Sequence, residues 1–409
     1  MICTAANALW LAGCLPEAAR YRRATNRVRE EQAEVLLRLV RANENTEFGR
    51  RHRFATITTV REYQARVPIR SYDDYEADIT RIAAGEPRIL TADPVRLFEP
   101  TGGSVSPTKL IPYTSSLQHE FERGIQPWIA DLFLNDLHLM RGQAYWSLSP
   151  PAAGRERRTA GGIAVGFEDD SHYVGGWQRA LVQAVMAAPA SIRNAPDIQT
   201  FQYQTVLALV RSHSLRLISV WNPSFLSVLL DQLPSHADAL LRDLEGDRER
   251  ADVLRAALRV SMPGERHAVL WPHLRLVSCW TDANAARPAA GLAHLLPQAR
   301  IQGKGLIATE AFVSLPLAGR DGSALAVRSH FFEVCADRRT RGGRRARAGA
   351  GRRAQARTAV HRHRLNRRRF VSLSAERRGG SHRPRARMPA DPLRREARIR
   401  VRLVRREAP

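Results

Sequence analysis

A short polar loop between two apolar stretches carries the residue types of a phosphate-binding site. It lies within residues 98–114 (FEPTGGSVSPTKLIPYT) and contains two adjacent glycines, Gly102 and Gly103, and one lysine, Lys109. Its hydroxyl residues are Thr101, Ser104, Ser106 and Thr108. Glycines let backbone N–H groups approach an anion closely, hydroxyls add donors, and a lysine adds a compact positive charge. The glycine spacing is not that of a P-loop, and a surface turn with a solvated lysine explains the same residues.

A second motif, GKGLIATEA at residues 303–311, places a hydroxyl beside a carboxylate at Thr309 and Glu310. The motif follows a predicted strand at residues 300–302. A carboxylate is a ligand that a hard cation such as Mg²⁺ prefers, and a hydroxyl can donate to a phosphate oxygen. An isolated Thr–Glu pair is also common on protein surfaces, so its significance depends on its surroundings.

From the first motif to just beyond the second, the sequence alternates predicted strands with predicted helices. We expect strands at residues 144–148, 215–220, 274–280, 300–302 and 312–315, and helices at residues 199–211, 225–233, 242–260 and 289–296. Asn222 and Pro223 form a strong start for the second of these helices. The alternation predicts an α/β fold with layered, mostly parallel sheets and flanking helices. Ligands of such sheets bind beyond the carboxyl ends of the strands, so we expect both motifs to face one crevice.

The first 135 residues predict further helices around the loop. Residues 17–43 have an amphipathic pattern, and Ser71 with Asp74 indicates a capping box that opens a helix ending at Gly85. Residues 86–98 then lead to the loop as a strand. Ser115 or Ser116 is expected to cap the next helix, whose apolar positions include Phe121 and Ile125. Arg123 in that helix could pair with a substrate carboxylate, but we expect a solvated surface arginine.

The charge of the chain is concentrated at its C-terminal end. The 409 residues have a net charge of +24, of which residues 336–409 contribute 26 arginines, no lysine and 5 acidic residues. The preceding 335 residues are close to neutral, as expected for an ordinary globular protein. Nucleic-acid binding therefore concerns the arginine-rich tail alone.

The cysteines and the N-terminus indicate the cellular compartment. Four cysteines without CxxC spacing argue against a zinc site or a disulfide framework, which favours a reducing cytoplasm. The apolar start contains LAGC at residues 11–14, similar to a lipoprotein cleavage site, but no basic residue precedes it. We expect a first helix packed on the body and no membrane span.

Several separated blocks resemble the acyl acid–amido synthetases of the Gretchen-Hagen auxin-responsive type, which are adenylate-forming enzymes. The blocks run from about Arg27 to Val334 and include TGGSVSPTKLIP, SVWNPSFLSVLL, IQGKGLIATEAFVSLPL and SHFFEV. The resemblance implies that an acid attacks ATP to give an acyl-adenylate, which an amine or amino acid then consumes. A thiol acceptor, as in an acyl-CoA ligase, remains an alternative.

The resemblance also implies roles for the residues of both motifs. Thr101, Gly102, Gly103, Ser104 and Ser106 would bind ATP phosphates, with Lys109 as a catalytic charge. Thr309 would contact the α-phosphate, and Glu310 would be catalytic and hold Mg²⁺ on the phosphates. Two positions depart from the family, because Leu306 stands where an adenine-stacking aromatic is usual and Gly103 replaces a hydroxyl residue. Trp221, Phe225 and Trp280 are candidates for the acyl pocket, although core packing explains each equally well.

The resemblance stops after Val334, where the family would have a GGLYRYRLGD block with a ribose-binding Asp and then a small mobile domain. The tail offers too few large apolar residues for a core. Reading one nucleotide later through residues 366–378 (NRRRFVSLSAERR) permits TGGGSYRYRLSDV, close to the missing block. The absence of lysine from the tail favours the same interpretation, a frame shift in a GC-rich gene.

These observations predict a large adenylate-forming domain at residues 1–335 and an arginine-rich, low-complexity tail at residues 336–409, which we expect to be disordered or frame-shifted. The small C-terminal domain would then be missing or garbled, and the chain would be a poor enzyme as written. The alternative of another class is a protein that binds nucleic acid through a genuine basic tail.

Overall fold

A four-stranded parallel sheet lies at the centre of the fold. The computed structural model describes residues 2–101, 109–148, 158–166, 176–320, 322–336 and 399–402. The strands are β3 (Gln143–Trp146), β5 (Leu215–Ser219), β6 (Leu276–Cys279) and β7 (Arg300–Gly303), and they lie side by side in sequence order. The α/β fold with a mostly parallel sheet and flanking helices is thus confirmed.

Helices cover both faces of this sheet because alternate strand residues point to opposite sides. Ile218 and Val277 face a core formed with α8 (Ile198–Arg211), α9 (Pro223–Asp231) and the helices that follow. Those helices are α10 (Ala237–Asp243), α11 (Arg248–Leu258), α12 (Pro263–Leu270) and α13 (Ala286–Leu295). Leu217 and Leu276 face a second core, which includes α1 (Ile2–Ala24), α6 (Ser115–Asn135) and α7 (Gly176–Val185).

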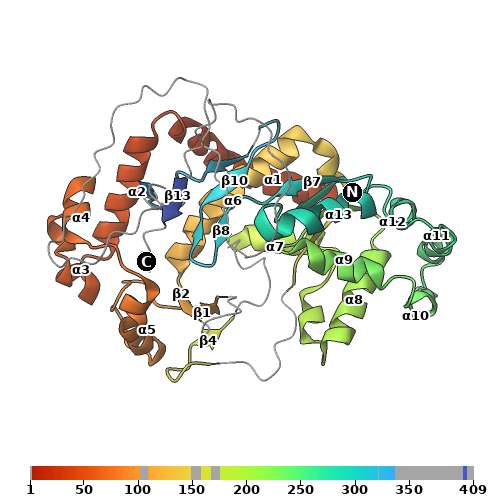
Figure 1. Cartoon of the computed structure of the whole chain (residues 1–409), viewed down its shortest axis with the longest axis horizontal. Helices are drawn as coiled ribbons and strands as arrows, with labels where there is room; N and C mark the ends of the chain where they lie inside the picture. The colour runs from red at the N-terminus through yellow and green to blue at the C-terminus, as the bar shows by residue number, and fades with distance from the viewer. Residues whose placement is uncertain are drawn as a thin grey trace, which may run out of the picture.

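A third core lies at the end of the molecule opposite α8–α12 (Figure 1). It is built from α2 (Val28–Ala42), α3 (Glu47–Arg51), α4 (Val60–Arg66) and α5 (Glu76–Ala83). These helices pack on a small sheet in which β1 (Leu97–Pro100) pairs antiparallel with β2 (Leu110–Tyr113) and parallel with β4 (Ala164–Val165). The loop that the sequence predicts to bind phosphate joins β1 to β2.

Short hairpins follow the parallel sheet. Strand β8 (Ile307–Ala308) pairs with β9 (Ala311–Phe312), and β10 (Ser314–Pro316) pairs with β11 (Ser323–Leu325). Strand β12 (Glu333–Ala336) pairs antiparallel with β13 (Ile399–Arg402) from the tail. All other residues of the predicted tail, 337–398 and 403–409, lie outside the described residues.

Local capping predictions are largely confirmed. Asn222 caps α9 with Pro223 at its first position, the Ser71–Asp74 capping box is present, and Gly85 has a left-handed φ of +98°. Thr114, not Ser115 or Ser116, caps α6 by accepting a hydrogen bond from the Leu117 N–H.

Some predicted boundaries are wrong for local reasons. The helix expected at residues 17–43 is interrupted between Ala24 and Val28, at the turn-favouring residues Thr25 and Asn26. The helix expected at residues 242–260 is interrupted before α11, where a glycine precedes the Asp247 cap. Residues 86–96 are not a strand, and the strand expected at residues 312–315 is divided between β9 and β10.

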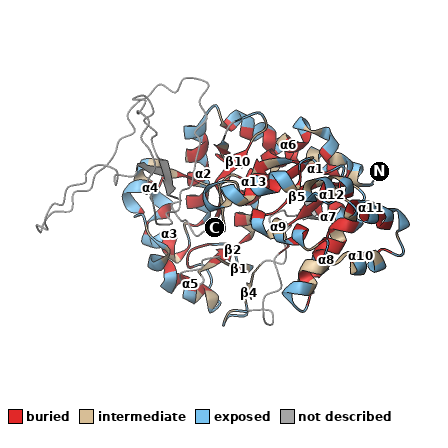
Figure 2. Cartoon of the chain, turned by 45° about the vertical axis from the view of Figure 1, so that its right-hand side comes forward, coloured by how far each residue is buried: buried red, intermediate tan, exposed pale blue. Residues whose placement is uncertain are grey.

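The N-terminal apolar segment is the buried helix that the sequence predicted. Trp10 and Cys14 of α1 are almost fully buried in the second core, and α1 lies along α6. Figure 2 shows buried residues on the inward faces of the helices and exposed residues on their outer faces. Among the described residues, no helix is both long and apolar enough to cross a membrane.

Candidate active site

The loop predicted to hold phosphate is closed at its base by a strand pair. Pro100 lies opposite Leu110 in the register of β1 and β2, and the Thr101 N–H donates a 2.8 Å hydrogen bond to the Lys109 carbonyl. Gly102, Gly103, Ser104, Ser106 and Thr108 fall in residues 102–108, which are outside the described residues. The structure therefore fixes where this loop leaves and rejoins the fold.

Lys109 lies at the end of the loop beside two residues of the capping-box segment. Its Nζ is 3.4 Å from Asp73 Oδ1 and 4.8 Å from the centroid of the Tyr72 ring. The Tyr72 hydroxyl in turn accepts a 3.0 Å hydrogen bond from the Leu110 N–H. Asp73 is 78% exposed, so this ion pair contributes little and a multiply charged phosphate can compete for the ammonium.

Thr309 and Glu310 form the two-residue connection between β8 and β9. Ala308 pairs with Ala311 across this turn, and both Thr309 and Glu310 are partly exposed. Gly305, just before the hairpin, has a φ of +77°, and a Cβ there would come 2.6 Å from the Ser314 carbonyl oxygen. The hairpin therefore presents a hydroxyl residue and a carboxylate residue at its tip.

The two motifs are supported by one aromatic residue of α6. The Phe121 ring lies 6.2 Å from Tyr113, at the end of β2, and 6.4 Å from Phe312 of β9. Gly124 allows this close approach, because a Cβ at that position would lie 2.2 Å from the Phe312 ring. The strand after the Lys109 loop and the strand after Glu310 thus pack into the same core.

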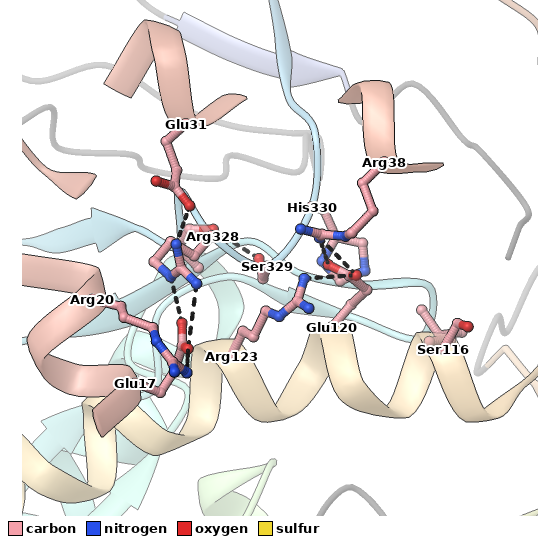
Figure 3. A network of polar contacts seen from close by, with 12 residues as sticks. Glu17, Arg20, Glu31, Arg38, Ser116, Glu120, Arg123, Arg328, Ser329 and His330 are labelled. Carbon is pink, nitrogen blue, oxygen red and sulfur yellow. Dashed lines mark hydrogen bonds and ion pairs between the residues drawn. The ribbon is translucent and has the colours of Figure 1, made fainter. Parts of the chain in front are cut away.

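A network of ion pairs lies behind β9, where one set holds the segment of Arg328 to α1 and α2 and a second set joins α2 to α6 (Figure 3). Arg328 bonds Glu17 of α1 and Glu31 of α2, both of which are almost fully buried. The neighbouring Ser329 hydroxyl donates a 2.7 Å hydrogen bond to the Phe312 carbonyl. The network therefore anchors the base of the β8–β9 hairpin.

Arg123 belongs to this network, so the prediction of a solvated surface arginine was wrong. Its Nη1 is 3.0 Å from Glu120, which also bonds Arg38 of α2. Burial lowers the pKa of the Arg123 guanidinium and raises the pKa of the Glu120 carboxyl. The Glu120–Arg123 pair is local to α6, but its enclosure by Arg38 is not, because Arg38 comes from a helix distant in sequence.

The aromatic candidates for the acyl pocket have different environments. Trp221 and Trp280 follow β5 and β6, and their ring centroids are 5.8 Å apart. Trp280 is 41% exposed, which is unusual for so large an apolar side chain. Phe225 instead packs against Phe201 in the first core. Trp221 and Phe225 are both partly buried, so Trp280 is the one exposed ring of the three, and Trp221 is the one that packs beside it.

Leu306 packs in a small apolar cluster with Ala311, Val313 and Phe332. It is partly buried there, and its contact with an adenine ring stays a prediction. Lys304, two residues earlier, was not selected from the sequence as a site residue. Its side chain is buried at the carboxyl end of β7 against Trp128 and Trp221.

Comparisons with known proteins identify one family. The family described as "GH3 family N-terminal domain" matches residues 17–301, more than half of the chain. A solved structure described as "AtGH3.15 acyl acid amido synthetase in complex with 2,4-DB" is similar with a TM-score of 0.67 at 17% identity, over 80% of this chain and 61% of that chain. A second, "GH3.15 acyl acid amido synthetase", has a TM-score of 0.62 at 17% identity, over 75% and 58%.

The likeness to the solved structures concerns the fold, and this chain spans less than two thirds of the length of either. A search of curated proteins found no match.

Proposed function

We propose that this chain, which belongs to the GH3 family, is an ATP-dependent ligase that activates a small carboxylic acid as an acyl-adenylate and transfers the acyl group to an amine or amino acid. The observation that carries the proposal is the family match over residues 17–301, which includes the whole Lys109 loop. The common support of β2 and β9 by Phe121 agrees with it, because both motifs then belong to one structural unit.

In the first step, a carboxylate oxygen of the acid attacks the α-phosphorus of ATP, and pyrophosphate leaves. Lys109 stabilises the negative charge that builds up on the phosphate oxygens, and the loop N–H and hydroxyl groups would donate hydrogen bonds to these oxygens. Tyr72 and Asp73 hold the ammonium at the loop base until the nucleotide binds. Thr309 would donate its hydroxyl to the α-phosphate.

The residues present fit a Mg²⁺ ion that is bound mainly by the nucleotide. No cluster of three or more His, Cys, Asp or Glu side chains occurs in the described part of the chain. Mg²⁺ is commonly held by one or two carboxylates together with substrate phosphates, and Glu310 supplies one such carboxylate at a hairpin tip. When bound, the ion would neutralise phosphate charge.

In the second step, the amine attacks the acyl carbon and AMP leaves. Positioning is the main contribution of the protein to this step, since the adenylate is already activated. Acid-dependent exchange of labelled pyrophosphate into ATP tests the first step, and we expect Lys109→Met to lower it by about 100-fold or more and Glu310→Gln to lower it as well.

Arg255→Met is a matched control, because Arg255 is an exposed cation on α11 that pairs only with exposed Asp252 among its described contacts. Equal exchange in the Lys109 and control variants would contradict the proposed role of the loop.

We also propose that the reading frame shifts before residue 366, so that the large domain ends near residue 335 and the chain as written is impaired. The support is the YRYRLSD sequence that the alternative frame of residues 366–378 permits. Sequencing the gene across codons 330–380 tests this. An open alternative frame with that block is expected, whereas stop codons or another peptide would make the arginine tail genuine and favour its binding to nucleic acid.

A further inference from the structure

Lys304 places a positive charge inside the protein at the edge where ligands of parallel sheets bind. It directly follows β7, and the whole residue is only 7% exposed. Its Nζ is 2.5 Å from the Ser219 hydroxyl, at the end of β5. The same atom lies 5.0 Å from the Trp221 ring centroid and 5.5 Å from that of Trp128. Residues from α6, from the end of β5 and from the end of β7 thus meet at one ammonium group.

The choice of lysine at this position is specific in a chain that otherwise uses arginine. Lys109 and Lys304 are the only two lysines among 409 residues, and each lies in one of the two motifs of the candidate site. An ammonium is a compact charge with three donors, whereas a guanidinium is a wide planar fork. The space between two indole rings and a hydroxyl suits the compact group.

Aromatic surface leads from this charge to the outside. Trp221 is partly exposed, and Trp280 beside it, after β6, is 41% exposed. From Trp280 through Trp221 to Lys304, exposed indole therefore gives way to a buried ammonium. A ligand that matches this gradient has an aromatic or apolar body and a single anionic end.

We propose that Lys304 binds the carboxylate of the acid substrate, with the apolar body of the acid against Trp221 and Trp280. This deepens the proposed function and rests on it for the identity of the ligand as a substrate. An ammonium has three N–H donors, so it can hold Ser219 and a carboxylate together. A charge-assisted hydrogen bond in a buried environment is strong, and the indole faces stabilise the cation beside it.

The test compares a carboxylate with its neutral amide, because the two have nearly the same shape but only the carboxylate carries a negative charge and two acceptor oxygens. Binding of phenylacetate, 4-phenylbutanoate, phenylacetamide and 4-phenylbutanamide to the full chain would be measured by quenching of tryptophan fluorescence, and MgATP binding would be measured separately. The wild type should bind at least one acid about 10- to 100-fold more tightly than its amide. Lys304→Met should bring this ratio close to one and leave the MgATP affinity within about twofold.

Two further variants separate this role from a structural one and from the proposed reaction. Lys304→Gln keeps a polar side chain without charge and should lose the same preference, which covers the case in which Lys304→Met does not fold. Lys109→Met should keep the acid preference while it weakens MgATP binding. If acids bind through Lys304 but no adenylate forms, even with the alternative reading frame restored, the carboxylate site stands and the proposed reaction fails.

The proposal is overturned by any of three results. The first is a wild type with no preference for acids over amides across the four probes. The second is a Lys304 variant that keeps the preference of the wild type, which would make the lysine a structural cation between two indoles. The third is a Lys304→Met variant with weaker MgATP binding and unchanged acid binding, which would assign the ammonium to phosphate.

Discussion

His330 should make the stability of the fold depend on pH to a predictable extent. Its ring lies 5.8 Å from Phe121 and 6.3 Å from Phe332, in the network behind β9 (Figure 3). Both ring nitrogens are enclosed, and neither has a hydrogen-bond partner among the described residues. Burial, helped by the nearby charge of Arg123, lowers the pKa of His330 from 6.5 to about 3. The imidazole is therefore neutral in the folded protein at any ordinary pH.

The sign of the effect follows from the difference between the folded and unfolded pKa. Below about pH 6.5 the unfolded chain binds a proton at His330 that the folded chain does not bind, so unfolding is favoured as the pH falls. The loss approaches about 1.4 kcal/mol per pH unit, which amounts to about 2 kcal/mol between pH 8 and pH 5. The stability is fully present above the unfolded pKa and continues to fall until about pH 3.

Urea unfolding of the wild type and of His330→Leu at pH 8, 7, 6 and 5 measures this contribution. The variant should lose about 2 kcal/mol less over that range, and it should be at least as stable at pH 8, because leucine removes two unsatisfied nitrogens. Burial also lowers the pKa of His52 and His267, so these residues add to the pH dependence of both proteins. The contribution of His330 is therefore the difference between the two curves of unfolding free energy against pH. Exposed His294→Leu is the control. Parallel curves for wild type and His330→Leu would refute the reasoning.

Three further substitutions test the supports of the site. Arg328→Met removes the cation that buried Glu17 and Glu31 share and leaves them only the exposed Arg20 and Arg27, so it should cost about 3 kcal/mol of unfolding free energy. Exposed Arg255→Met should cost little. Gly124→Ala forces a methyl group against Phe312 and should cost about 1–3 kcal/mol by the same urea measurement. Tyr72→Phe removes the hydrogen bonds between the Tyr72 hydroxyl and the Leu110 backbone, and it should lower pyrophosphate exchange about tenfold while the urea midpoint changes little. Unchanged exchange would show that Tyr72 does not position the lysine beside it.

The sequence predicted those features that depend on neighbouring residues. The strands of the parallel sheet and the Asn222–Pro223 helix start are local patterns, and both are confirmed. The separated sequence blocks were also sufficient for the family, which the match over residues 17–301 confirms. Local signals failed where two caps competed, since Thr114 precedes Ser115 and takes the capping position of α6.

The sequence could not predict features that arise from distant contacts. Arg123 reads as a surface residue until Arg38 and Glu120 enclose it, and Lys304 reads as a loop residue until Trp128 covers it. The composition offered one signal for Lys304, because lysine is so rare in this chain. The same rarity weakens one argument for a frame shift, since a lysine-free tail is unremarkable in a protein with only two lysines.

Transfer of labelled oxygen tests the acyl-adenylate account most directly. The chain would be incubated with MgATP, hydroxylamine as the amine, and an aryl carboxylic acid whose two carboxyl oxygens are ¹⁸O. The account predicts that AMP acquires one ¹⁸O atom, because a carboxylate oxygen bonds to the α-phosphorus and stays there when the amine displaces AMP. Label in inorganic phosphate, or hydroxamate formed with unlabelled AMP, would contradict it.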